Sequence, residues 1–454
     1  MPRNEDLDRI DLLDTVGLLH EHLTPALCRA VFDDVREGER ERIWSLQLLA
    51  EFWVAVVLRA PQSLTQALDA AAGGGGGGGY PAVKASPQAF FSKCKNLTWE
   101  FFARVFTLFN ESIAAAEPGR FCAHLRPILR RFGGRIWAVD GSTLDPVARR
   151  LKLLRKDRRL PMSGSVVAFY DFGRGTIARL RFESTPQGLE PVVAKEELAH
   201  VPAGTLLVAD RLYGLPWFFE ATRERGVFAV ARRNERAGMR AGETLSTTMH
   251  DGGTLTDRLV TVGLSRNSRP QVLRCVTWAK GSKRLQLLTD VLDPQMLSAE
   301  EIVSLYRERW SVERLFYDLK EVLDLHSFYA ANTNAIGMQV YACGLVHVAL
   351  RTAQGRIAAS ARVEPERISV EKLFPKVAAA SNVLTTLELG FEAVRRVNPG
   401  VKLRKPSWAK MDFAHAELKT VLVEPRKPGG RKKALRSPKA TLRALPEPPP
   451  QPPR

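Results

Sequence analysis

Hydrophobic residues along the first 130 positions recur about every 3.6 residues, most clearly over 43–58 and 99–109. This period predicts a helical N-terminal region spanning residues 1–130. Alternating segments follow further along the chain, at 163–172 and 176–183, and a glycine-containing turn separates them as in a β-hairpin. The run Leu206 to Ala209 has no polar residue, which is typical of a strand covered on both faces.

The order of elements after the hairpin favours an α/β fold. Composition predicts a helix over 191–200, the apolar strand ending at Ala209, a second helix over 216–225 and a further strand over 227–231. Hairpin, helix, strand, helix and strand together predict a mixed sheet with helices packed on it.

A different pattern occupies residues 234–294. Short alternating segments at 260–264, 272–278 and 285–288 are separated by glycine- and proline-containing turns. We interpret this stretch as a β-rich insertion into the α/β core. The alternative is an ordinary continuation of the same sheet.

The segment from 305 to 323 predicts one helix with three distinct faces. At about 100° per residue, Tyr306, Arg309, Glu313 and Lys320 share a stripe roughly 60° wide. A second stripe is apolar and predicts burial; it contains Leu305, Val312, Phe316, Leu319 and Leu323. The opposite side is charged and is predicted to face solvent; it contains Arg307, Arg314, Asp318 and Glu321.

The polar stripe favours binding of an extended anion. Tyr306 and Lys320 are roughly 21 Å apart on an ideal helix, too far to hold one small ligand together. Donors placed on both sides of Glu313 suit a nucleic-acid backbone. The alternative is an ordinary surface ion pair between Arg309 and Glu313, which are four residues apart.

Two aspartates end predicted strands upstream of this helix. Asp140 follows Ile-Trp-Ala-Val, and Asp210 follows Leu-Leu-Val-Ala. The carboxyl ends of strands are where open α/β sheets place their chemistry, although an aspartate there also serves as a turn or cap residue. With Glu313 they make three carboxylates, the oxygen ligands that could hold two magnesium ions for phosphodiester chemistry.

These residues resemble a known family. Asp140 in Val-Asp-Gly-Ser-Thr, Asp210 in Val-Ala-Asp-Arg-Leu-Tyr-Gly and the complete tetrad of Tyr306, Arg309, Glu313 and Lys320 are similar to the DDE transposases of bacterial insertion sequences, specifically the insertion-sequence-four family. The resemblance covers about residues 133 to 350. It implies a ribonuclease H-like catalytic domain at 131–350, with the β-rich insertion at about 234–294.

The resemblance also implies an activity, namely metal-dependent DNA cleavage and strand transfer at the ends of an insertion sequence. Asp140, Asp210 and Glu313 would be the catalytic metal ligands for Mg²⁺, with Mn²⁺ able to substitute. Tyr306, Arg309 and Lys320 would contact the DNA, and the active complex would be a homodimer. Two alternatives remain open: a DDE-fold nuclease without strand transfer, and a non-catalytic DNA-binding protein derived from a transposase.

The resemblance further implies a DNA hairpin intermediate, held in known members by an aromatic residue of the insertion. Leu285 is at the corresponding position here, and Trp278 lies seven residues earlier. Trp278 is therefore a candidate for base stacking, with a core role as its alternative.

Charge points to the same class of partner. The formal net charge is +18, which favours a polyanion such as double-stranded DNA carrying the inverted repeats or the target. A helical region is expected at 351–424, followed at 425–454 by a basic, proline-rich tail that is predicted to be disordered. By analogy with the family, residues 1–130 are a candidate for binding the element ends, and a scaffold or dimer contact is the alternative.

Other sequence features exclude several classes of protein. The seven-glycine run from Gly73 to Gly79 lacks the Lys-Ser/Thr of a phosphate loop and predicts a flexible linker. Five scattered cysteines have no zinc-site spacing and argue against a disulfide framework. With no signal peptide or long apolar run, we expect a cytoplasmic, nucleoid-associated protein.

Overall fold

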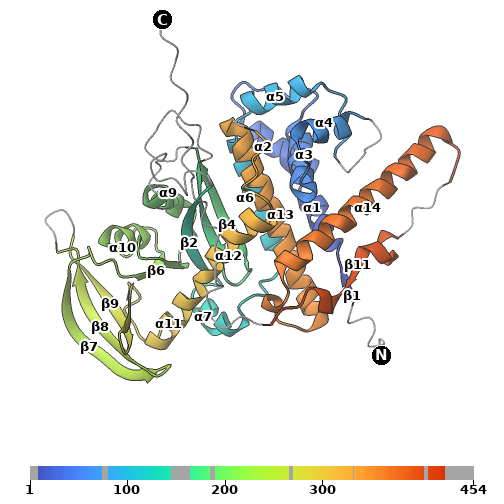
Figure 1. The fold of residues 1–454 in the computed structure, drawn as a ribbon. Coiled ribbons are helices and arrows are strands. Elements are labelled where there is room, and N and C mark those ends of the chain that lie inside the picture. Colours follow the sequence, from blue (N-terminus) through green and yellow to red (C-terminus); the bar gives the residue numbers. More distant parts are fainter. Residues whose placement is uncertain are drawn as a thin grey trace, which may run out of the picture.

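The computed structural model describes residues 9–73, 80–144, 164–184, 190–264, 269–330, 332–402 and 407–424. Within them, helices from both ends of the chain form one body, and a mixed sheet lies beside it (Figure 1). The predicted tail at 425–454 and most of the glycine run lie outside the described residues.

The N-terminal region is helical, as the hydrophobic period predicts. Ser45, Ser63 and Ser86 precede three of its helices, and each side chain accepts a hydrogen bond from a first-turn amide. The helices are α1 (Asp14–His22), α2 (Pro25–Val35), α3 (Leu46–Arg59), α4 (Leu64–Ala72), α5 (Pro87–Asn96), α6 (Glu100–Ala116) and α7 (Arg126–Arg131). One strand was not predicted: β1 (Arg9–Asp11) pairs with β11 (His415–Glu417).

The central sheet of the described residues has nine strands in the order β4-β3-β2-β5-β6-β10-β9-β8-β7. Strands β2, β5 and β6 are parallel, and all other neighbours are antiparallel. The predicted hairpin is therefore confirmed as β3 and β4. The strands are β2 (Ile136–Thr143), β3 (Ser165–Asp171), β4 (Thr176–Glu183), β5 (Leu206–Ala209), β6 (Phe228–Arg232), β7 (Met239–His250), β8 (Gly253–Val262), β9 (Gln271–Lys280) and β10 (Lys283–Thr289).

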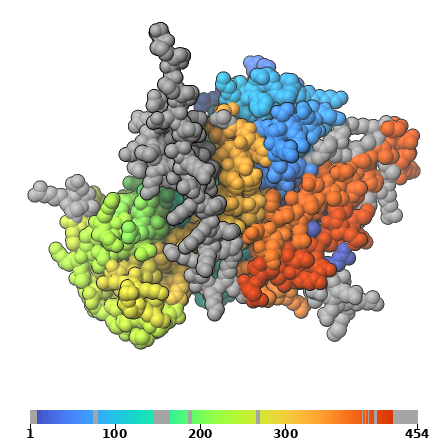
Figure 2. Space-filling view, viewed as in Figure 1, coloured from blue at the N-terminus to red at the C-terminus, as the bar shows by residue number. Residues whose placement is uncertain are grey.

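The β-rich stretch at 234–294 continues this sheet, because β10 pairs with β6. The continuation that we set as the alternative is thus what the structure shows, although the stretch does lie between β6 and the next helix in sequence. Figure 2 shows these strands as the yellow-green projection at the lower left. Strand β7 was missed because it is an exposed edge strand with almost no apolar alternation.

Helices cover both faces of the inner strands. On one face, α9 (Glu190–Glu197) and α10 (Pro216–Arg223) pack over a cluster that includes Val139 and Leu207. On the other, Ala138 and Val208 join the large core shared with the helical body. This alternation of side chains explains why Leu206–Ala209 has no polar residue.

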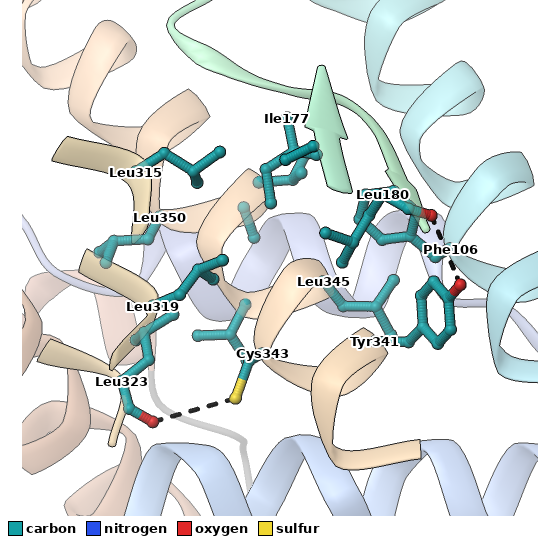
Figure 3. Packing of buried hydrophobic residues seen from close by; sticks show 14 of the residues in the cluster. Phe106, Ile177, Leu180, Leu315, Leu319, Leu323, Tyr341, Cys343, Leu345 and Leu350 are labelled. Carbon is teal, nitrogen blue, oxygen red and sulfur yellow. Dashed lines mark hydrogen bonds between the residues drawn. The ribbon is translucent and has the colours of Figure 1, made fainter. Parts of the chain in front are cut away.

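Helix α13 (Thr333–Ala361) joins the sheet to the helical body. It packs against α1, α3, α6 and β4, and Tyr341 from it donates a hydrogen bond to the Leu180 carbonyl at 3.4 Å (Figure 3). A Cβ added to Gly344 would lie 3.0 Å from Phe106, so the glycine allows close approach to α6. The last long helix is α14 (Val370–Val397), which fits the predicted helical C-terminal region.

Two further findings bear on the sequence predictions. None of the described helices is long and apolar enough to cross a membrane. All five cysteines are buried and unpaired, in agreement with the absence of a disulfide framework.

Candidate active site

Asp140 and Asp210 are neighbours at one edge of the sheet. Val139 pairs with Ala209 in the parallel ladder of β2 and β5, so the aspartate that follows each lies at the same level. Asp210 comes directly after β5, as predicted, whereas Asp140 lies inside β2, which continues to Thr143. The Asp210 carboxylate also accepts the Leu212 amide at 2.6 Å, so it forms a turn as well.

The helix that carries the polar tetrad is divided into three parts. They are α11 (Ala299–Glu308), α12 (Trp310–Tyr317) and a π-helical turn, η5 (Asp318–Val322), with Arg309 between the first two. The predicted apolar stripe is confirmed, since all five of its residues are buried. α12 packs on β2 and β3, which brings the tetrad to the edge that holds the aspartates.

The predicted solvent side is wrong at Asp318. Its side chain is 2% exposed and accepts a hydrogen bond from Arg314 at 3.3 Å. The π-helical turn changes the angular step from ideal helical spacing, and α13 and α14 both pack against that turn. A projection at constant angle could not include either effect.

Arg309 connects two of the three predicted carboxylates. It donates to Glu313 at 2.7 Å, and its other terminal nitrogen lies 3.6 Å from Asp140. The Arg309–Glu313 ion pair therefore exists, but only 9% of the Arg309 side chain is exposed, so it is not a simple surface pair. Its Nε atom is buried and lacks a hydrogen-bond partner among the described residues.

Lys320 and Tyr306 are buried, as Arg309 is. Lys320 Nζ donates to Ser142 Oγ and to the Thr143 carbonyl, each at 2.6 Å, and so ties the tetrad helix to the end of β2. Tyr306 lies under the Arg309 guanidinium, 5.7 Å from carbon to ring centre. Burial raises the pKa of Tyr306, and the charges of Arg309 and exposed Arg232 partly oppose that rise.

Sequence reasoning missed a fourth carboxylate at this edge, that of Glu190 on the first residue of α9. It accepts a hydrogen bond from the Tyr213 hydroxyl at 2.8 Å and lies against Gly141. Acidic residues are common in first helical turns, so Glu190 carries no distinctive signal. The sequence contains only an indirect indication of a nearby side chain: Gly141 follows Asp140, and Tyr213 lies three residues after Asp210.

Negative charge exceeds positive charge at this edge. Burial raises the pKa of Asp140 to about 7, and the charge of Glu190 adds to the rise while that of Arg309 opposes it. Burial also raises the pKa of Glu190, with opposition from the Tyr213 hydrogen bond and a further rise from Asp210. The carboxylates therefore repel one another, and Arg309 compensates only part of their charge.

The described residues do not form a ready-made metal site. No group of three or more His, Cys, Asp or Glu among them is arranged to hold an ion. Arg309 contacts both Asp140 and Glu313, so the three predicted ligands do not meet directly in this arrangement. Their chemistry nevertheless suits a hard divalent cation, because all are carboxylates with excess negative charge.

Comparisons with known proteins point to one class. Residues 163–349 match the family model described as a transposase DDE domain. A Sinorhizobium fredii protein assigned as transposase y4zB is 28% identical over 159 residues, covering 34% of this chain and 44% of that protein. A Synechocystis protein assigned as a transposase for insertion sequence element IS4SA is 32% identical over 82 residues, covering 17% and 24% respectively.

The matched stretches thus span less than half the length of these relatives. Among solved structures, the chain is similar to a piggyBac transposase in a synaptic complex with hairpin DNA, at 10% identity and a TM-score of 0.37, covering 86% of this chain and 83% of that one. That structural likeness is too weak to support an argument. The family match and the two relatives support a DDE transposase.

Proposed function

We propose that this protein is a transposase of the insertion-sequence-four type, which cuts and joins DNA at the ends of a mobile element. The observation that carries the proposal is the meeting of Asp140 and Asp210 at one sheet edge with the Arg309–Glu313 pair. The order of strands from β4 to β6, with an antiparallel hairpin beside three parallel strands, fits a ribonuclease H-like core. Residues 131–350 would form this catalytic domain.

Asp140, Asp210 and Glu313 are the residues that would hold magnesium, or manganese in its place. Bound there, the metal would supply positive charge for in-line displacement at phosphorus and would lower the pKa of an attacking water. The carboxylates are charged oxygen donors at a partly exposed edge, and the Glu313 side chain is 39% exposed. Arg309 would keep Asp140 and Glu313 together until DNA and metal arrive.

We also propose that Arg309 binds a phosphate, although at 7% exposed it is as buried as Tyr306 and Lys320. Its unpartnered Nε offers a further donor, and a guanidinium can hold two phosphate oxygens at once. Arg232 is exposed at the end of β6 on the same edge and would add a second positive charge for the DNA backbone. Tyr306 would support the Arg309 guanidinium. Lys320 would hold the end of β2 and also contact DNA.

The turn between β9 and β10 lies beyond the same edge. Strand β10 runs antiparallel to β6, and its first residues extend past Arg232, which pairs with Leu287. Trp278 on β9 pairs directly with Leu285 on β10. The two positions considered for the residue that holds a DNA hairpin are therefore side by side. The Trp278 indole donates to the His250 carbonyl at 2.9 Å, and its role in stacking a base stays a prediction.

The assembly and its partners follow from the proposed function. The DNA would be the inverted repeats at the element ends and then the target, bound by a homodimer. The helical region at 1–130 would contribute to end binding, and the protein would act in the cytoplasm near the nucleoid.

A cleavage assay tests the proposal. Purified protein would be mixed with a duplex that carries the short inverted repeats flanking its gene, together with a plasmid target and MgCl₂. We expect nicking at the repeat boundary followed by joining to the plasmid. Cleavage without joining would instead support the nuclease alternative, and binding without cleavage would support a non-catalytic descendant.

A further inference from the structure

We propose that Glu190 is a positioning residue, which fixes the two aspartates relative to each other through Gly141 and Tyr213. The inference rests on the proposed function, because it concerns the site that Asp140 and Asp210 form. It assigns Glu190 no contact with substrate. Its effect would be on how well the aspartates hold a divalent cation.

The contacts of Glu190 reach both segments that carry an aspartate. One oxygen accepts the Tyr213 hydroxyl at 2.8 Å, and Tyr213 is three residues after Asp210. The other oxygen lies against Gly141, the residue after Asp140, where an added Cβ would be only 2.4 Å away. Burial raises the pKa of Glu190, and the hydrogen bond from the Tyr213 hydroxyl partly opposes that rise.

These contacts favour positioning over direct metal binding. One Glu190 oxygen accepts a hydrogen bond from Tyr213 and the other is packed against Gly141, so the carboxylate is held by protein contacts on both sides. Tyr213 is fully buried in the cluster under α10, so its hydroxyl is fixed in place. A single carboxylate thus connects the start of α9, the end of β2 and the loop after β5.

The structure also explains why glycine follows Asp140. The Gly141 amide donates to Asp140 at 3.0 Å while its α-carbon faces Glu190. A side chain here would push the Glu190 carboxylate away without removing any charge. Gly141→Ala should therefore displace the Glu190 carboxylate while every charged group is kept.

The experiment measures binding of Mn²⁺ alone to the full chain by calorimetry, without DNA. Tyr213→Phe is the decisive variant because it keeps every carboxylate and removes only the hydroxyl donor. We expect Mn²⁺ affinity to fall about 10-fold or more, as is usual when a group that orients a metal ligand is lost. Glu190→Gln should lower it by at least as much, and the double variant should be no worse than Glu190→Gln.

Two matched controls separate positioning from general packing. Glu197→Gln removes another carboxylate of α9, one that pairs with Arg179 at 2.9 Å. Tyr170→Phe removes another buried hydroxyl, one that accepts from Arg351 at 3.0 Å. Both variants can lower thermal stability, but neither should change Mn²⁺ affinity.

The results for Glu190→Gln and Tyr213→Phe together distinguish a positioning residue from a metal ligand. If Glu190→Gln weakens Mn²⁺ binding and Tyr213→Phe does not, Glu190 is itself a ligand and the positioning role is wrong. If neither variant differs from wild type, Glu190 has no role in the site. Should Tyr213→Phe fail to fold, Gly141→Ala gives the same test, with weakened binding expected and unchanged binding contradicting the proposal.

Failure of the proposed function looks different. A wild-type protein that binds Mn²⁺ through these residues but neither cuts nor joins DNA would leave the positioning role standing. A wild-type protein that cleaves normally while Tyr213→Phe keeps full Mn²⁺ affinity would overturn only the positioning role.

Discussion

Two buried arginines, one on a strand of the sheet and one between two helices, have opposite surroundings. Arg274 on β9 is fully buried, pairs through two nitrogens with Asp257 and donates to the Val291 and Leu297 carbonyls at 3.0 and 2.8 Å. Arg309 lies beside several carboxylates, keeps one unpartnered nitrogen and has a half-exposed partner in Glu313.

The difference separates an ion pair with every group satisfied from one whose partners keep unmet charge. At Arg274, one cation meets one carboxylate and every group is satisfied, so the pair holds β8 and β9 to the segment before α11. At Arg309, negative charge is in excess and the geometry is open to solvent on one side. Unbalanced charge of this kind is typical of functional sites, and it is in keeping with the cation and phosphate binding that we propose.

The largest expected effect is on catalysis. Glu313→Gln should reduce magnesium-dependent cleavage below detection while leaving end binding within a few fold, because it removes one proposed metal ligand and keeps the helix. Gel assays of cleavage and of binding on the same DNA measure both. Normal cleavage by the pure variant would show that Glu313 is not a ligand.

The second prediction compares the two arginines directly. Arg274→Met should lower the free energy of unfolding by about 3 to 5 kcal/mol, because it leaves Asp257 charged and buried without a partner. Arg309→Met should cost less than Arg274→Met, since Glu313 can be solvated and Asp140, with its pKa raised to about 7, can take up a proton. Urea denaturation measures both values, and equal losses would remove the distinction between the two pairs.

Asp290 is a buried carboxylate that forms no ion pair among the described residues. It accepts the Ala229 amide at 2.8 Å, and burial raises its pKa to about 6. Because the folded state holds this proton more tightly than the unfolded chain, stability should fall as the pH rises from about 4 to about 6. Asp290→Asn should remove that fall, worth on the order of 1 to 3 kcal/mol. Denaturation at pH 5 and pH 8 tests this, and a wild-type pH profile in the variant would contradict it.

The smallest predicted effect is on DNA affinity. Arg309→Ala should flatten the plot of log affinity against log salt by about one unit if the guanidinium binds one phosphate. Lys320→Ala should do the same if Lys320 leaves Ser142 to contact DNA, and should leave the slope unchanged if it only holds β2. A wild-type slope in Arg309→Ala would restrict Arg309 to its two carboxylates.

Local sequence pattern predicted much of the fold. The hairpin, the strand before Asp210 and the apolar stripe of the tetrad helix depend on alternation or helical period within a few residues. Strand β7 and the pairing of β1 with β11 could not be predicted, because polar edge strands and pairings between distant segments leave no such pattern. The burial of Asp318 depends on a π-helical turn that side-chain spacing does not indicate.

The residues of the candidate site were chosen from sequence by type, and their arrangement could not be predicted. Asp140 and Asp210 each follow an apolar run, and the sheet places them together because β2 and β5 are parallel neighbours. Glu190 was missed since its role depends on contacts with Gly141 and Tyr213, each far from it in sequence. The burial of Lys320 against Ser142 is likewise a tertiary contact.

The central claim is that Asp140, Asp210 and Glu313 bind a divalent cation. Thermal denaturation with and without Mn²⁺ tests this most directly. At a concentration about 100 times its dissociation constant, Mn²⁺ should stabilise the wild-type protein by about 2.7 kcal/mol, and should not stabilise Asp210→Asn. Equal stabilisation of both proteins, or of neither, would contradict the account.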